Sequence, residues 1–138
     1  MSSLATIEEK VLGAVNGLGK FKKVSSAGRK EISKAKSYPA SSVFFVRALP
    51  VGKKPRPSEE LLFNVVVINK NVKSEKDAAR DTYTLLEDVR DVILGKRFSL
   101  TDIEGFDLKG IKLVGYISGV ITYVLEFTTV RYLPVPTE

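Results

Sequence analysis

The stretch GVITYVLEFTTVRYL, residues 119–133, consists almost entirely of residues that favour β-strands. Side chains alternate between the two faces of a strand, so its positions divide by parity. The odd positions at its centre are apolar and predict a buried face: Ile121, Tyr123, Leu125 and Phe127. The even positions are only half apolar and include one charge: Val120, Thr122, Val124, Glu126 and Val130. The fold must therefore explain what covers the second, mixed face of this strand.

The composition limits both the fold class and the possible chemistry. The chain has 138 residues, 43% hydrophobic and 28% charged, which predicts one ordinary globular domain over residues 1–138. It contains no Cys and no His, which excludes disulfides, Cys/His zinc sites, Cys nucleophiles and His general bases. No run approaches the ~18 consecutive apolar residues of a membrane span, and the acidic, amphipathic N-terminus is unlike a secretory signal. We therefore expect no cofactor, no metal and no membrane partner.

Charge is concentrated in one segment. Residues 20–56 hold eleven Lys and Arg against one acid, Glu31, for a net charge of +10, while the rest of the chain holds eleven basic and fifteen acidic residues, for −4. This separation predicts an oriented interaction surface, although Lys-rich loops can also serve solubility alone. The candidate basic residues are Lys20, Lys22, Lys23, Arg29, Lys30, Lys34, Lys36, Lys53, Lys54 and Arg56.

Two segments have the spacing of amphipathic helices. Residues 4–18 place an apolar side chain every three or four positions, and residues 74–94 do the same with an acidic outer surface. The capping candidates are Thr6, Ser2 or Ser3 for the first helix and Ser74 for the second. Glycines end both helices, at residues 17–19 and at Gly95.

The remaining regular elements read as strands. A short strand is expected near Phe21 and Val24, and longer ones over 42–47, 60–69, 109–117 and 120–132. The Ser118-Gly119 pair predicts a tight hairpin between the last two strands. The connections expected are an extended basic loop over about 25–41, a Pro-rich loop or hairpin arm over about 50–59, and an irregular segment over 96–107.

The resulting order, α-β-β-β-α-β-β, predicts an α+β fold. We expect a mostly antiparallel sheet of four or five strands with the two helices packed on one face. Two helices cannot cover both faces, yet the strands over 43–46, 61–68 and 120–130 carry apolar residues on both parities. The second face is therefore predicted to dock another protein, through Val120, Thr122, Val124 and Val130. The alternative is that the two long loops fold over that face.

Catalytic and ligand motifs are sparse. Asp102, Glu104 and Asp107 lie within six residues and could bind a hard cation, but they lack the ligand spacing of a calcium loop. The glycines of GAVNGLGK, residues 13–20, end a helix instead of opening one, so they do not form a phosphate loop. The basic stretch could contact nucleic acid through phosphates, although no helix-turn-helix, RRM-type aromatic motif or zinc module accompanies it. No enzymatic activity is expected.

The order of the predicted elements and the pattern of their hydrophobic residues resemble those of a known family. The stretches that carry the likeness are LATIEEKVLGAVNGL (4–18), SSVFFVRA (41–48), LLFNVVVINKN (61–71), KDAARDTYTLLEDVRDVILGKR (76–97) and GVITYVLEFTTVRY (119–132). Together they resemble the tail protein family of Mu-like phages and prophages, which is similar to the tail-terminator, or tail-completion, proteins of tailed phages. The likeness runs over nearly the whole chain but rests on no diagnostic motif, and the basic loop at 25–37 matches no family motif.

The resemblance implies a structural protein of the virion tail, without catalysis. Such a subunit is expected to form a ring, typically a hexamer, that caps the tail tube and joins it to the head. Its partners would be other copies of itself, the tail tube protein and the head-completion or connector proteins, with assembly in the cytoplasm of the bacterial host. A head-to-tail ring needs two different complementary patches on each subunit, and the acidic second helix could meet a neighbour's basic loop. The alternative function is nonspecific nucleic-acid binding by the basic stretch 20–56.

Overall fold

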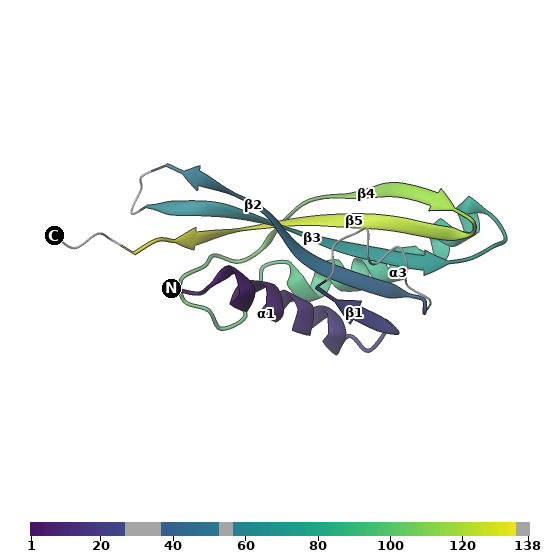
Figure 1. Cartoon of the computed structure of the whole chain (residues 1–138), viewed down its shortest axis with the longest axis horizontal. Coiled ribbons are helices and arrows are strands. Elements are labelled where there is room, and N and C mark those ends of the chain that lie inside the picture. The colour runs from purple at the N-terminus through teal and green to yellow at the C-terminus, as the bar shows by residue number, and fades with distance from the viewer. Residues whose placement is uncertain (27–36, 53–56, 135–138) are drawn as a thin grey trace.

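A computed structural model describes residues 1–26, 37–52 and 57–134 of the chain. Within them lie two helices and five strands, drawn in Figure 1. Their bounds are α1 Leu4–Gly17, β1 Lys23–Ser25, β2 Ala40–Val51, β3 Ser58–Lys70, α3 Glu75–Ile93, β4 Asp107–Ile117 and β5 Val120–Tyr132. The element order α-β-β-β-α-β-β and the α+β class predicted from the sequence are confirmed.

The five strands form one sheet in the order β1-β2-β3-β5-β4. Every pairing is antiparallel except that of β1 with β2, which is parallel and covers only three residues on each strand. The central strand is β3, whose residues Leu61–Ile68 are apolar on both parities apart from Asn64. A strand with neighbours on both sides and apolar residues on both faces belongs inside a sheet, as its sequence predicts.

Both helices begin at serine caps. The Ser3 side chain accepts from the backbone N–H of Thr6 at the start of α1, and Ser74 accepts from the N–H of Asp77 at the start of α3. Of the candidates for the first cap, Ser3 therefore takes the position. A serine oxygen there satisfies one of the backbone donors that a helix leaves free at its N-terminus.

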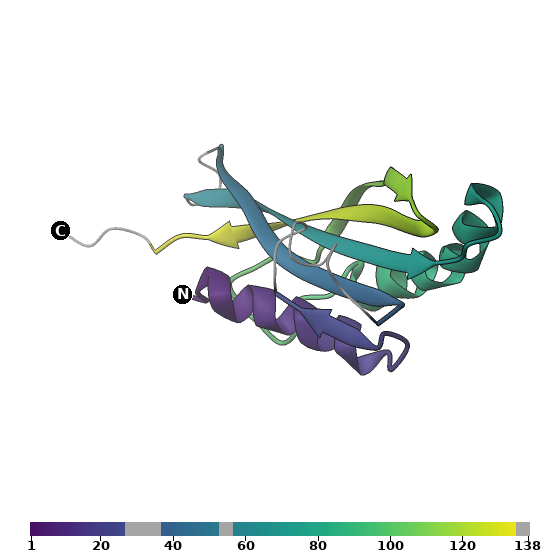
Figure 2. The same cartoon turned by 45° about the vertical axis from the view of Figure 1, so that its right-hand side comes forward.

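The two helices lie on the same face of the sheet, as Figures 1 and 2 show from two directions. The core between the layers takes Ile7, Val11 and Val15 from α1, and from β5 the residues that the parity argument assigned to the buried face: Ile121, Tyr123, Leu125 and Phe127. Neither helix among the described residues is long and apolar enough to cross a membrane.

The β2–β3 hairpin is longer than its sequence predicts. β2 continues through Pro50 and Val51, and β3 already begins at Ser58, so the predicted loop over 50–59 loses residues at both ends. Pro50 is tolerated because β2 is an edge strand at that point: it pairs with β3 on one side, while β1 reaches only Ala40–Ser42 on the other. The hairpin end of the two strands turns away from α1 and projects beyond it (Figures 1 and 2).

The other predicted connections agree in part with the structure. Ser118 and Gly119 have φ values of +52° and +80°, as a type I′ turn requires, and they close the predicted β4–β5 hairpin. The predicted basic loop over 25–41 is shorter, because Ser25 ends β1 and Ala40 begins β2. Residues 27–36 and 53–56 lie outside the described residues, so the alternative that these loops cover the second sheet face is not addressed by the fold.

Candidate interaction surface

A small apolar cluster covers one end of the second sheet face, the face opposite the helices. Val124 is only 3% exposed and forms a small cluster with Ala40, Val66 and Ile68. Tyr38, Phe44 and Val120 pack against this cluster. Cross-strand neighbours within the chain therefore cover most of the Val124 side chain, and its predicted contact with a partner stays a prediction. The other predicted contact residues of this face, Val120, Thr122 and Val130, are half-buried.

A groove of about 350 Å³ crosses the same face beside that cluster. Its lining comes from four strands: Phe44 of β2, Asn64 of β3, Val124 of β5, and Lys112 and Val114 of β4. We call these five residues the groove.

The groove is continued toward the β4 edge by a residue without a side chain. The register aligns Asn64 with Glu126, and Glu126 in turn with Gly110 of β4. A Cβ added at Gly110 would meet only Glu126 Oε1, at 4.0 Å. The row that contains Asn64 is therefore open on its β4 side.

Two acceptor groups make the groove polar: the carboxylate of Glu126 beside it and the side-chain oxygen of Asn64. The Lys112 ammonium lies 3.6 Å from Glu126 Oε1, a loose ion pair whose side chains are 62% and 29% exposed. Asn64 Oδ1 is buried and has no hydrogen-bond partner in the part of the chain that the structure describes. A buried acceptor left unpaired costs about 1–3 kcal/mol, so such groups are rare in folded proteins. The sequence signal for this residue was available, since Asn64 is the one polar residue within Leu61–Ile68.

Exposed apolar side chains gather on the two edge strands. Over the described ranges, eleven large hydrophobic residues are exposed, and seven of them lie on β2 or β4. Those on the distal half of β2 are Val46, Leu49 and Val51, and those on β4 are Ile111, Leu113, Val114 and Ile117. Scattered surface hydrophobics need no explanation, but a concentration at both edges of one sheet is typical of a contact surface.

The predicted basic residues do not form one described patch. Lys20 is paired with Asp88 of α3 at 2.5 Å, and Lys22 and Lys23 are exposed beside β1. The other members of the predicted set lie outside the described residues: Arg29, Lys30, Lys34, Lys36, Lys53, Lys54 and Arg56. The last three fall in the sequence between the end of β2 at Val51 and the start of β3 at Ser58.

The acidic surface of α3 is partly used within the chain. Asp88 binds Lys20, Asp91 binds Arg90 at 2.8 Å, and Asp81 accepts a hydrogen bond from Asn71. The predicted contact of this helix with a neighbour's basic loop would therefore compete with these internal partners.

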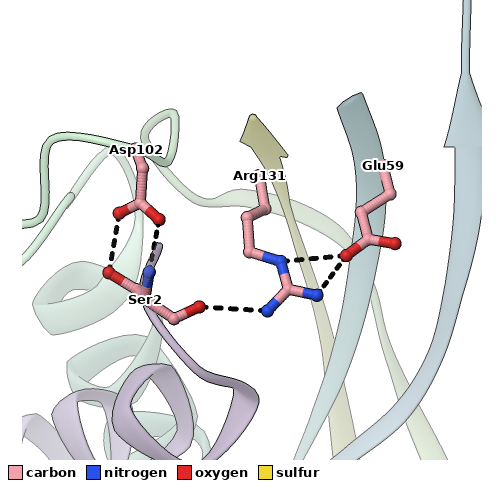
Figure 3. A network of polar contacts seen from close by, with 4 residues as sticks. All are labelled: Ser2, Glu59, Asp102 and Arg131. Atoms are coloured by element: carbon pink, nitrogen blue, oxygen red, sulfur yellow. Dashed lines mark hydrogen bonds and ion pairs between the residues drawn. The ribbon is translucent and has the colours of Figure 1, made fainter. Parts of the chain in front are cut away.

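A polar network fixes the N-terminus to the sheet, as Figure 3 shows. Arg131 is 8% exposed; its guanidinium pairs with Glu59 on the facing position of β3 and donates to the Ser2 carbonyl at 3.0 Å. Ser2 in turn donates to Asp102 through its backbone N–H and its hydroxyl, both at 2.6 Å. Burial opposes ionisation of the Asp102 carboxyl, but the two Ser2 hydrogen bonds, together with the Asp102 backbone N–H and the N-terminal charge, lower its pKa.

The three acids considered as ligands for a hard cation, Asp102, Glu104 and Asp107, do not come together. Asp102 is occupied by Ser2, and Glu104 accepts from the Tyr132 hydroxyl at 2.5 Å. Across residues 1–26, 37–52 and 57–134, no three carboxylates come together as a metal site. The three acids of this segment therefore have separate surroundings.

Comparisons with known proteins bear on the fold. No protein-family model matches the chain, and no curated protein matches it in sequence. Among solved structures, it is similar to a chain from a structure described as "Virion of native gene transfer agent (GTA) particle", with a TM-score of 0.55 and 15% sequence identity. The match covers 88% of this chain and 84% of that chain. At this identity the likeness shows a shared fold.

Proposed function

We propose that the protein is a structural component of a phage-type virion: a tail terminator or minor tail protein that forms an oligomeric ring, caps the tail tube and joins it to the head. The observation that carries this proposal is the shared fold with a chain of the gene transfer agent virion particle, over 88% of this chain. Fold alone does not define function, so the surface must agree with it.

The surface agrees with a subunit built to associate. The groove contains a buried acceptor at Asn64 that is unpaired among the described residues, and two sheet edges expose apolar side chains. A solitary subunit gains nothing from either feature. Both become favourable when a partner supplies a donor and covers the apolar side chains. The surfaces also differ from each other, as a head-to-tail ring requires.

The proposed role needs no catalysis. The ring would stop growth of the tail tube by occupying its end and would present its other side to the head. Its partners would be identical subunits, the tail tube protein and the head-completion or connector proteins, first in the cytoplasm of the host and then in the virion tail.

Nucleic-acid binding, the alternative, receives less support. All three candidate cations that the structure describes are exposed, but Lys20 is already paired with Asp88, which leaves only Lys22 and Lys23 without an ion pair among the described residues. Binding through phosphates would fall steeply between low and moderate salt, which separates this alternative from a ring held by apolar contacts.

Immunogold electron microscopy of particles from the virus that encodes the chain tests the proposal. The label is expected at the junction of tail and head, and particles made without the protein are expected to have tail tubes of irregular length. Label on the capsid or at the distal tail tip, with tubes of normal length in its absence, would contradict a terminator.

A further inference from the structure

The proposed ring leaves open which surfaces join one copy to the next. We propose that residues 46–51, the distal half of β2 and here called the arm, dock on the groove of a neighbouring copy. The inference rests on the proposed oligomer and names its contact. It is supported by two surfaces with complementary groups: the arm has exposed apolar side chains and a cation, and the groove has apolar walls and acceptor oxygens.

The arm offers apolar side chains and a free cation. Val46, Leu49 and Val51 are 42%, 45% and 41% exposed, although all three belong to a regular strand. Arg47 between them is exposed, and its guanidinium has no partner among residues 1–26, 37–52 and 57–134. An apolar strand with an open edge gains free energy when another surface covers it.

The groove offers the complementary groups. Phe44, Val114 and Val124 give it apolar walls, and Asn64, which also lines it, has a buried Oδ1 that accepts from no donor among the described residues. Glu126 adds a carboxylate whose Lys112 partner is 3.6 Å away. A guanidinium has five N–H donors and no acceptor, so Arg47 suits both oxygens at once. The two surfaces are thus matched in charge as well as in apolar character.

The apolar end of the arm, Leu49 and Val51, cannot reach the groove of its own chain. Arg47 faces Leu62 and lies nearer, but no hydrogen bond or ion pair joins it to a groove residue in the described part of the chain. Phe44 borders the groove, and β2 continues from it through the arm as a single strand. With a rise of about 3.3 Å per residue, five more residues carry the strand ~16 Å away from Phe44. Contact of Leu49 and Val51 with a groove therefore joins two copies, and because the two surfaces differ, it is head-to-tail.

Symmetric pairings of like surfaces are less favourable. Two arms placed together would oppose their Arg47 side chains, and two grooves placed together would oppose their Lys112 side chains, which are 62% exposed. Like charges placed opposite each other destabilise a contact. Head-to-tail docking instead brings Arg47 to Glu126 and Asn64.

The test uses the full-length protein and one variant of each surface. Leu49→Asp places a charge on the arm, and Val114→Asp places one on the groove wall; both side chains are exposed, so both variants are expected to fold. Leu94→Asp is the control, since Leu94 is 43% exposed at the end of α3. Far-UV circular dichroism and thermal unfolding establish that each variant is folded.

Sedimentation velocity from about 1 µM to 1 mM then measures association. The wild type and Leu94→Asp are expected to self-associate, whereas Leu49→Asp and Val114→Asp each lose at least about tenfold in affinity, equivalent to ~1.4 kcal/mol. An equimolar mixture of the two defective variants is expected to form a 1:1 dimer, because the intact arm of Val114→Asp can dock on the intact groove of Leu49→Asp. Arg47→Ala should weaken that mixed dimer when introduced into Val114→Asp and not when introduced into Leu49→Asp.

Three results would overturn the inference. They are undiminished self-association of either defective variant, a mixture that stays monomeric while the wild type associates, and a wild type that is monomeric up to 1 mM. The second leaves the proposed ring intact and shows that other surfaces build it. The position of the protein in the virion is decided by the immunogold experiment, so the two proposals can fail separately.

Discussion

The carboxylate of Glu8 on α1 accepts a hydrogen bond of 3.1 Å from the backbone N–H of Phe45 on β2. Phe45 lies just beyond the three residues of β2 that pair with β1, where the outer edge of the strand has no ladder partner among the described residues. A helix side chain thus replaces a strand in satisfying an edge donor, which is one way that proteins protect sheet edges. The protection ends here, and the arm begins at the next residue.

Removing this cap should destabilise the subunit. Glu8→Ala leaves the Phe45 N–H without its acceptor, and we expect the free energy of unfolding to fall by about 1–2 kcal/mol. Glu8→Gln keeps an acceptor oxygen and should cost less, and Glu9→Ala, on the exposed side of the same helix, should be close to neutral. Urea unfolding monitored by circular dichroism makes the comparison. Equal effects of Glu8→Ala and Glu9→Ala would show that the bond contributes nothing.

Arg131 provides a second test of stability. Arg131→Met removes the partner of Glu59, whose side chain is only 19% exposed, and leaves a carboxylate in a poorly solvated site. Breaking one side of such a pair costs about 3–5 kcal/mol, measured by urea unfolding. The double variant Arg131→Met/Glu59→Met removes both charges and should recover most of that loss. A double variant as unstable as Arg131→Met would mean that the Ser2 carbonyl, not Glu59, is the essential partner.

Asp102 should make stability depend on acidity. Because its pKa is lowered in the folded state, its ionised form stabilises the fold above the usual Asp value of about 3.9, and that contribution is lost as the pH falls through the folded value. The stability difference between wild type and Asp102→Asn is therefore expected to shrink steadily below about pH 4. Urea unfolding from pH 7 to pH 2 gives both curves. Ser2→Ala, which removes one of the two hydrogen bonds, should lie between them; a difference that stays constant with pH would contradict the linkage.

Local patterns were sufficient to predict the elements and their order. The spacing of four residues between Ile7 and Val11, and the spacing of two residues that puts Ile121, Tyr123 and Leu125 on one face, are properties of contiguous sequence. Both sets are buried in one core. The central place of β3 also followed from its own residues, because only a strand with cover on both faces can be apolar on both parities.

The site depended on contacts that no contiguous pattern encodes. The Lys20–Asp88 and Glu59–Arg131 pairs span 68 and 72 residues, and the groove combines residues of four strands that only the register brings together. Pro50 indicated a loop in the sequence, because its position on an edge strand becomes visible only in the tertiary structure. One usable signal was missed: Arg131 falls on the buried parity of its strand, where a charge implies a partner.

Two valines on the second face should respond differently to lysine. Val124 is 3% exposed beside Val66 and Ile68, so Val124→Lys buries an unpaired ammonium and is expected to cost several kcal/mol, roughly 2–4, in the free energy of unfolding. Val130 is half-buried, and a lysine there can extend its ammonium into water, so Val130→Lys should cost less than about 1 kcal/mol. Thermal and urea unfolding separate the two. A fully stable Val124→Lys would mean that this part of the face is open to partners after all.

Replacing Asn64 is expected to change the stability of the subunit and its self-association in opposite directions. Asn64→Val removes a buried acceptor that has no partner among the described residues and places a β-branched side chain in the central strand, so the subunit should gain about 1 kcal/mol in urea unfolding. Asn64→Asp has the same shape but sets a second carboxylate opposite Glu126, and it should destabilise instead. If a neighbour's Arg47 donates to Asn64, Asn64→Val also weakens self-association in sedimentation velocity even though each subunit is more stable. A residue that contacts a neighbouring copy is expected to weaken self-association when it is replaced. A variant that is more stable and associates as well as the wild type would therefore show that the Asn64 oxygen makes no such contact.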